Sequence, residues 1–227
     1  MTHPAIIGII EFGSTARNDA NQHSDKDIFA VVDDVDADVL DELRALVAAE
    51  YGTVPSSVAC YSSSSFDQMI ARSSLFTWHL RMEGRVLCDP DGIFSEAFEN
   101  LRPYDAFATD LARFKDIYTD AIDAFKYSST LDTFERHVLF VVARNVCMLL
   151  TARRNRPTFG RRTVIPAARQ LYPELPLSPA VAETLEIGHL TYARNLHICE
   201  SQMGPGEPEL ILREVGALIA FAARALA

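Results

Sequence analysis

Two short motifs near the N-terminus hold residues that could bind a phosphate and a metal. A Gly-Ser pair at residues 13–14 follows an apolar run, and nine residues later Ser-Asp-Lys-Asp at residues 24–27 leads directly into a second apolar run. Carboxylates one residue apart on a strand point to the same face, so Asp25 and Asp27 would present their oxygens together. Mg²⁺ is usually held by one or two carboxylates with phosphate oxygens and water. The pair therefore predicts a magnesium site.

The Gly-Ser end of the stretch has the features of a phosphate site. Gly13 ends the first apolar run and lets the backbone come close to a ligand. The Ser14 hydroxyl and the amides of the following turn can donate to phosphate oxygens. Arg17 and Lys26 carry charge that would offset a triphosphate. These residues predict a nucleoside triphosphate bound through its metal; the alternative is that the two carboxylates are only solvated loop acids before a strand.

Hydrophobic periodicity divides the chain into a part with strands and a part with helices. Apolar runs predict strands at 6–12, 27–32, 54–62 and 85–88, with helices at 36–51 and near 66–72 between them. The segment 76–82 is left unassigned. Beyond Pro103, helical spacing marks the runs 104–127, 131–154, 179–202 and 209–226. We therefore expect an α+β fold, with a small mixed sheet and its helices over residues 1–102 and a helical bundle over residues 103–227.

Composition describes a globular chain with uneven charge. The 227 residues are 48% hydrophobic and carry a net charge of −10. Residues 1–100 hold 17 acidic and 6 basic side chains, net −11, whereas residues 101–227 hold 14 acidic and 15 basic, net +1. No run has the form of a secretory signal or a membrane span, and the four scattered cysteines lack a CxxC pair. A cytoplasmic protein without membrane contact and with reduced, buried thiols is expected.

The motif has a family resemblance. Gly-Ser, nine residues, Ser-Asp-x-Asp and an apolar strand resemble the signature of the DNA polymerase β-type nucleotidyltransferase superfamily, in particular its minimal nucleotidyltransferase branch and the aminoglycoside adenylyltransferases. The matching positions are Gly13, Ser14, Arg17, Ser24, Asp25 and Asp27. Asn18 stands where a second glycine is usual. The later helices resemble the HEPN-like or adenylyltransferase C-terminal domains of such proteins, but Arg144-Asn145 is not followed by histidine at the spacing of the ribonuclease members.

The resemblance implies a Mg²⁺-dependent enzyme that moves a nucleoside monophosphate, AMP from ATP, to a hydroxyl of a small molecule, a protein or an RNA such as a tRNA. Asp25 and Asp27 would be the catalytic metal ligands. The nucleotide would be held by Gly13, Ser14, Arg17, Ser24 and Lys26. An apolar face of the bundle could support a homodimer.

One expected residue of the superfamily is absent from its usual place. Members generally use a third acid on a later strand, but the predicted strand 54–62 contains none. Asp67 and Glu83 are the nearest acids downstream, and we expect both to be surface residues. The third acid could come from elsewhere, including Glu135 or Glu200, or the enzyme could be slow. The alternative function is a nucleotide-binding or partner-binding module without catalysis, as in a toxin–antitoxin or defence system.

A second group of charges lies in the helical half. Residues 153–162 include five arginines at the end of a predicted helix and in its loop. Arginine forks suit phosphates, including those of a nucleic-acid acceptor. The alternative is a solvated basic loop beside a helix C-terminus, where positive charge is favourable in any case.

Overall fold

The computed structural model describes residues 3, 5–18, 26–194 and 207–226. The chain divides into two compact units, Met1–Asp105 and Ala106–Ala227. In the part of the chain that is described, no helix is long and apolar enough to cross a membrane.

The first unit is built on a mixed sheet of four strands. They are β1 (Ile6–Phe12), β2 (Asp27–Val32), β3 (Val58–Ser62) and β4 (Arg85–Cys88). The strand order is β3-β2-β1-β4. β1 runs antiparallel to both β2 and β4, whereas β2 and β3 are parallel. The small mixed sheet expected from the sequence is therefore confirmed, with β1 and β2 at its centre.

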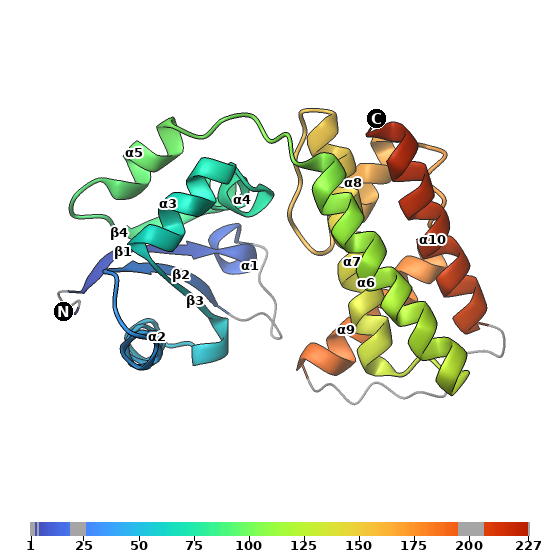
Figure 1. Ribbon diagram of the computed structural model, residues 1–227, viewed down its shortest axis with the longest axis horizontal. Coiled ribbons are helices and arrows are strands. Elements are labelled where there is room, and N and C mark those ends of the chain that lie inside the picture. The colour runs from blue at the N-terminus through green and yellow to red at the C-terminus, as the bar shows by residue number, and fades with distance from the viewer. Residues whose placement is uncertain (1–2, 4, 19–25, 195–206, 227) are drawn as a thin grey trace. The chain divides into compact units, whose positions relative to one another are not determined.

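Helices cover both faces of this sheet (Figure 1). They are α1 (Gly13–Ala16), α2 (Ala37–Tyr51), α3 (Ser63–Arg72), α4 (Leu75–Glu83) and α5 (Ile93–Glu99). Leu43 of α2 packs in one core cluster with Ile9 and Ile28. The opposite face holds a second cluster, in which Ile10 and Phe29 meet buried side chains from α3, α4 and α5. Burial on both faces explains why β1 and β2 read as continuous apolar runs.

Some helices and strands of the first unit lie where the sequence predicted them, and others do not. Helix α2 begins after Asp36 and ends at Gly52, whose φ of +66° is typical of a helix C-terminus. The strand predicted at 54–62 is correct only over its second half, because Pro55–Ser57 forms a 3₁₀ turn that begins at the proline. The unassigned segment 76–82 lies within helix α4.

The second unit is helical, as expected. Its helices are α6 (Phe107–Ser128), α7 (Thr133–Arg153), α8 (Val164–Leu171), α9 (Pro179–Arg194) and α10 (Glu207–Ala225). Helix α7 contacts the other four and forms the middle of the bundle (Figure 1). It begins with a capping box, in which the Asp132 side chain accepts from the amide of Glu135 and the Glu135 side chain accepts from the amide of Asp132.

Candidate nucleotide site

The Gly-Ser turn after β1 and the start of β2 meet at Gly13 and Asp27. Gly13 has a φ of +77°, a left-handed conformation that side chains other than glycine rarely adopt. A Cβ atom added to Gly13 would lie 2.5 Å from Oδ2 of Asp27. The backbone of the Gly-Ser turn therefore lies directly against the carboxylate at the start of β2.

The pairing of β1 with β2 sets the face on which Asp27 lies. Asp27 pairs with Phe12 across the two strands, and Glu11 pairs with Ile28. Directly opposed residues share a face, so Asp27 is on the side of Phe12 and Glu11 is on the other side. Glu11 is 2% exposed and forms an ion pair with Arg85 of β4. Glu11 is therefore a structural partner of Arg85 and not a second acid beside Asp27.

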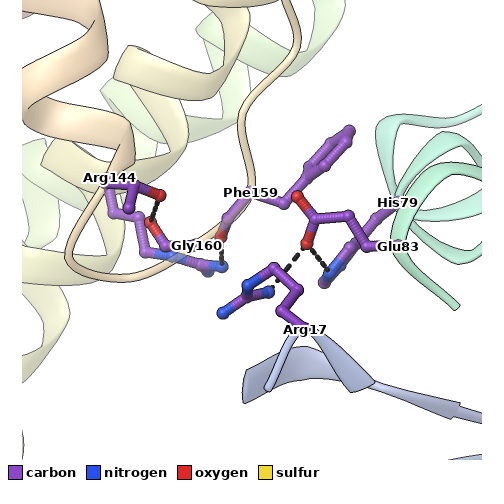
Figure 2. Close-up of polar contacts among 7 residues, drawn as sticks. Arg17, His79, Glu83, Arg144, Phe159 and Gly160 are labelled. Atoms are coloured by element: carbon purple, nitrogen blue, oxygen red, sulfur yellow. Dashed lines mark hydrogen bonds and ion pairs between the residues drawn. The ribbon is translucent and has the colours of Figure 1, made fainter. Parts of the chain in front are cut away.

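Arg17 follows α1 and joins it to the end of α4 (Figure 2). Its Nη1 donates to Oε2 of Glu83 at 2.7 Å, and the two side chains are 21% and 19% exposed. Nε2 of His79 lies 3.1 Å from the same carboxylate oxygen. The ring of His79 also meets Phe12 edge to face, at a centroid distance of 5.7 Å. The group of Arg17, Glu83 and His79, which we call the arginine anchor, thus packs beside the Asp27 face of the sheet.

The charge of Glu83 is set by its surroundings. Partial burial raises the pKa of its carboxyl, but hydrogen bonds to His79 and Arg17 and their positive charges outweigh that effect and leave the pKa below its ordinary value. Glu83 is therefore ionised at neutral pH. The expectation that Glu83 is a surface residue is wrong, because its side chain, at the end of α4, is 19% exposed and contacts Arg17.

Other predicted positions fall in different surroundings. Ser14 lies in α1 next to Gly13. Asn18, which replaces the second glycine of the pattern, has a φ of +61°. Asparagine tolerates this left-handed conformation better than most side chains, which accounts for the departure. The predicted site residues Ser24 and Asp25 lie outside the described residues.

Lys26 is directed towards α2. Its Nζ donates to the carbonyl of Tyr51 at 3.1 Å and lies 5.5 Å from the centre of the Tyr51 ring. The Lys26 carbonyl accepts from the Thr53 hydroxyl at 2.8 Å. These contacts hold Lys26 near the end of α2, whereas Arg17 is held by α4.

Comparison with known proteins assigns the first part of the chain. Residues 2–61 match the model of the nucleotidyltransferase domain family. The first unit contains a nucleotidyltransferase domain. A domain of this family supports transfer of a nucleoside monophosphate in general terms. The matched residues include both ends of the motif that meet at Gly13 and Asp27.

Solved structures and curated proteins add little to this assignment. A crystal structure of a toxin–antitoxin with AMP-PNP is 18% identical, with 53% of this chain and 90% of that chain covered and a TM-score of 0.33. A crystal structure of a mutant of the toxin–antitoxin MntA-HpeT is 17% identical, with the same coverages and TM-score. No curated protein matches this chain.

The third acid of the nucleotidyltransferase domain is not on β3. The strand reads Val-Ala-Cys-Tyr-Ser, as the sequence indicated. Among the described residues, no group of three or more histidine, cysteine, aspartate or glutamate side chains could hold a metal. Glu135, one candidate from the second unit, is engaged in the capping box of α7, and Glu200 lies outside the described residues. Asp27 is thus the one predicted metal ligand that the structure describes.

The arginine-rich segment of the second unit is bound to its own unit. Arg153 lies over the ring of Phe107, and Arg154 lies over the ring of Tyr172 and donates to its hydroxyl. Nε atoms of Arg161 and Arg162 lie 3.6 Å and 3.5 Å from one oxygen of Glu186. Four of the five arginines therefore have a structural role, which favours the interpretation as a basic loop. Figure 2 also draws Arg144, whose Nη2 donates to the carbonyl of Phe159 at 2.7 Å.

Proposed function

We propose that the protein is a Mg²⁺-dependent nucleotidyltransferase that moves AMP from ATP to a hydroxyl of an acceptor. The acceptor would be a small molecule, a protein or an RNA. Asp25 and Asp27 would hold the metal, and Gly13 and Ser14 would contact the triphosphate. The observation that carries the proposal is the contact between the Gly13 backbone and the Asp27 carboxylate within a nucleotidyltransferase domain.

The residues that are described suit a magnesium–triphosphate complex. The Asp27 carboxylate supplies hard oxygen ligands at the start of a strand, and the absence of a side chain at Gly13 avoids a clash with this carboxylate. A bound Mg²⁺ would neutralise charge on the triphosphate oxygens. Arg17 carries a further positive charge at the end of the same turn. Lys26 would take part only if its hydrogen bond to Tyr51 were broken on binding.

Transfer needs one bond to form and one to break. The acceptor oxygen attacks the α-phosphorus, the bond from that phosphorus to the pyrophosphate oxygen breaks, and the hydroxyl proton leaves. Positioning and charge neutralisation carry most of the catalysis of such a step. Because β3 offers no carboxylate, the base that takes the proton would come from another element or from solvent. The loss of a well-placed base typically costs about 10²–10⁴-fold in rate, so we expect slow turnover.

The test is transfer of label from ATP. The full-length protein is incubated with Mg²⁺, cell extract and ATP labelled with ³²P either at the α-position or at the γ-position. The proposal predicts a product that forms only when the protein is added and that carries label from α-labelled ATP but not from γ-labelled ATP. An unlabelled nucleotide that also serves as donor should reduce this labelling. Asp25→Asn/Asp27→Asn should lose the product.

A charge-matched control uses two exposed carboxylates of the same unit. Asp33→Asn/Asp38→Asn removes the same number of charges away from the motif and should keep transfer at the wild-type level. No α-labelled product with any nucleotide, or equal product from the Asp25/Asp27 variant, would contradict the proposal.

The second candidate function is a nucleotide-binding module without catalysis, such as one half of a toxin–antitoxin or defence pair. It is favoured by one observation, the absence of a carboxylate from β3. It predicts Mg²⁺-dependent binding of ATP without transfer to any component of the extract. A product labelled from α-labelled ATP excludes it.

A further inference from the structure

The arginine anchor connects the nucleotide motif, residues 13–27, to helix α4, which lies outside that motif. Arg17 and Glu83 are 66 positions apart in the sequence, yet Nη1 and Oε2 are 2.7 Å apart. Both side chains are about four-fifths buried. An ionic hydrogen bond that is shielded from water in this way is stronger and shorter than a neutral one. The contact therefore restrains the Arg17 side chain, which would otherwise sample many rotamers.

Glu83 is itself held from two sides. Gly84, the next residue, packs so closely that an added Cβ would lie 2.7 Å from Cγ2 of Ile10 in β1. His79, one helical turn before Glu83, lies against both the Glu83 carboxylate and the ring of Phe12. The end of α4 is thus fixed to the last residues of β1. Since Gly13 follows Phe12 directly, this attachment and the Gly13 turn share one strand end.

We propose that Glu83 is a positioning residue for nucleotidyl transfer, which it serves by holding the Arg17 guanidinium beside the Gly13 turn. His79 fixes the Glu83 carboxylate in turn. The inference rests on the proposed function, because it takes Arg17 to be a contact of the triphosphate. A guanidinium has five N–H donors, so a bond from Nη1 to Glu83 is compatible with further bonds to phosphate oxygens. A side chain that is restrained before binding loses less conformational entropy when the ligand binds, which favours binding.

A competing account uses the same contact. In it, Glu83 occupies Arg17 and must be displaced before the triphosphate can bind. The two accounts predict opposite effects of removing the carboxylate. Weaker binding follows from positioning, whereas tighter binding follows from competition.

A double-mutant cycle on the full chain separates positioning from a general structural effect. Dissociation constants of Mg²⁺ with α,β-methylene ATP are measured by calorimetry for wild type, Arg17→Ala, Glu83→Ala and the double variant. We expect Glu83→Ala to weaken binding about 3–10-fold in the wild-type background. In the Arg17→Ala background the same substitution should have no further effect, because Glu83 acts through Arg17.

A second variant and the pH dependence keep the test decisive if Glu83→Ala folds poorly. Glu83→Gln retains a hydrogen-bond acceptor and should lose less affinity than Glu83→Ala. Because the pKa of Glu83 is lowered by its partners, affinity should fall only at low pH, as the carboxylate is protonated, and that fall should be smaller in Arg17→Ala. Glu99→Gln, at an exposed glutamate of α5, is the charge-matched control and should bind as wild type does.

Each outcome has a defined meaning. Additive losses in the two single variants, unchanged binding in Glu83→Ala, or tighter binding in that variant would overturn the positioning role while leaving the proposed function intact. Failure of the folded wild type to bind any Mg²⁺-nucleotide would overturn the proposed function and this inference together.

Discussion

Gly13 has a left-handed backbone conformation and lies close to the Asp27 carboxylate, and one substitution can test both features. In Gly13→Ala the methyl group would meet the Asp27 carboxylate at 2.5 Å, and the left-handed φ costs about 1–2 kcal/mol for a residue with a side chain. We expect the free energy of unfolding to fall by at least that amount and the affinity for Mg²⁺-ATP to fall more than 10-fold. Urea unfolding and calorimetry measure the two effects.

Gly52→Ala is the matched control for this prediction. Gly52 has a φ of +66° at the end of α2, and no atom lies within 4 Å of the position that a Cβ would take. It should therefore lose stability from the backbone conformation alone and keep its affinity for nucleotide. Equal nucleotide affinity in the two variants would show that the Gly13–Asp27 contact is not part of a ligand site.

The sequence predicted the residues of the motif because their spacing is local. Gly13 directly follows β1 and Asp27 begins β2, the strand that pairs with β1, and the apolar runs of both strands could be read directly. Glu83 could not be found in this way, since its contact with Arg17 depends on how α4 packs against β1. One signal was available: His79 and Glu83 are four residues apart, which places them on one side if the segment is a helix.

Helices α7 and α9 are joined by a pair of histidines whose protonation should affect stability. Nδ1 of His137 lies 2.9 Å from Nδ1 of His189, and the rings stack at a centroid distance of 4.9 Å. Burial first, and then the charges of His137, Arg161 and Arg144, lower the pKa of His189 to about 4. Burial also lowers the pKa of His137. Both rings are therefore neutral in the folded protein near pH 7.

A lowered histidine pKa makes the folded protein less stable in acid. Between pH 6.5 and pH 4 the unfolded chain binds a proton at His189 that the folded chain does not, so the free energy of unfolding should fall as the pH decreases through this window. From pH 7 to pH 5 we expect His189 to contribute a loss of roughly 1–2 kcal/mol. Urea unfolding of His189→Gln should show a smaller loss, whereas His3→Gln, at an exposed histidine of the other unit, should match wild type. Equal losses in all three proteins would contradict the assignment.

Periodicity predicted the long helices but not how they are buried. In α7 the apolar Phe134 is 49% exposed, whereas Leu139 and Phe140 are buried. The reason is that α7 is surrounded by four helices and is buried nearly all round in its second half. Helix α8 was not predicted, since Pro166 interrupts its pattern; the proline is tolerated there because it lies in the first turn.

At the scale of the whole molecule, each of the two units has buried apolar residues of its own. Leu43 belongs to the core of the first unit, and Leu149 is buried in α7 of the second. We propose that the units are folding domains, since each has a size and a core typical of one. Scanning calorimetry should then resolve two transitions. We expect Leu43→Ala and Leu149→Ala each to reduce the free energy of unfolding by about 2–5 kcal/mol. Each variant should lower the midpoint temperature of a different transition. A single transition lowered by both variants would contradict this division.

Calorimetry of the full chain can test whether the Gly13–Asp27 contact forms a magnesium–nucleotide site. α,β-Methylene ATP, which cannot be cleaved between its α- and β-phosphorus atoms, is titrated with and without Mg²⁺ into wild type, Asp27→Asn and the control Asp33→Asn. A magnesium–nucleotide site at this contact predicts binding that requires Mg²⁺ in wild type and in the control, and at least a 10-fold loss of affinity in Asp27→Asn. Unchanged Mg²⁺-dependent binding in Asp27→Asn would contradict it.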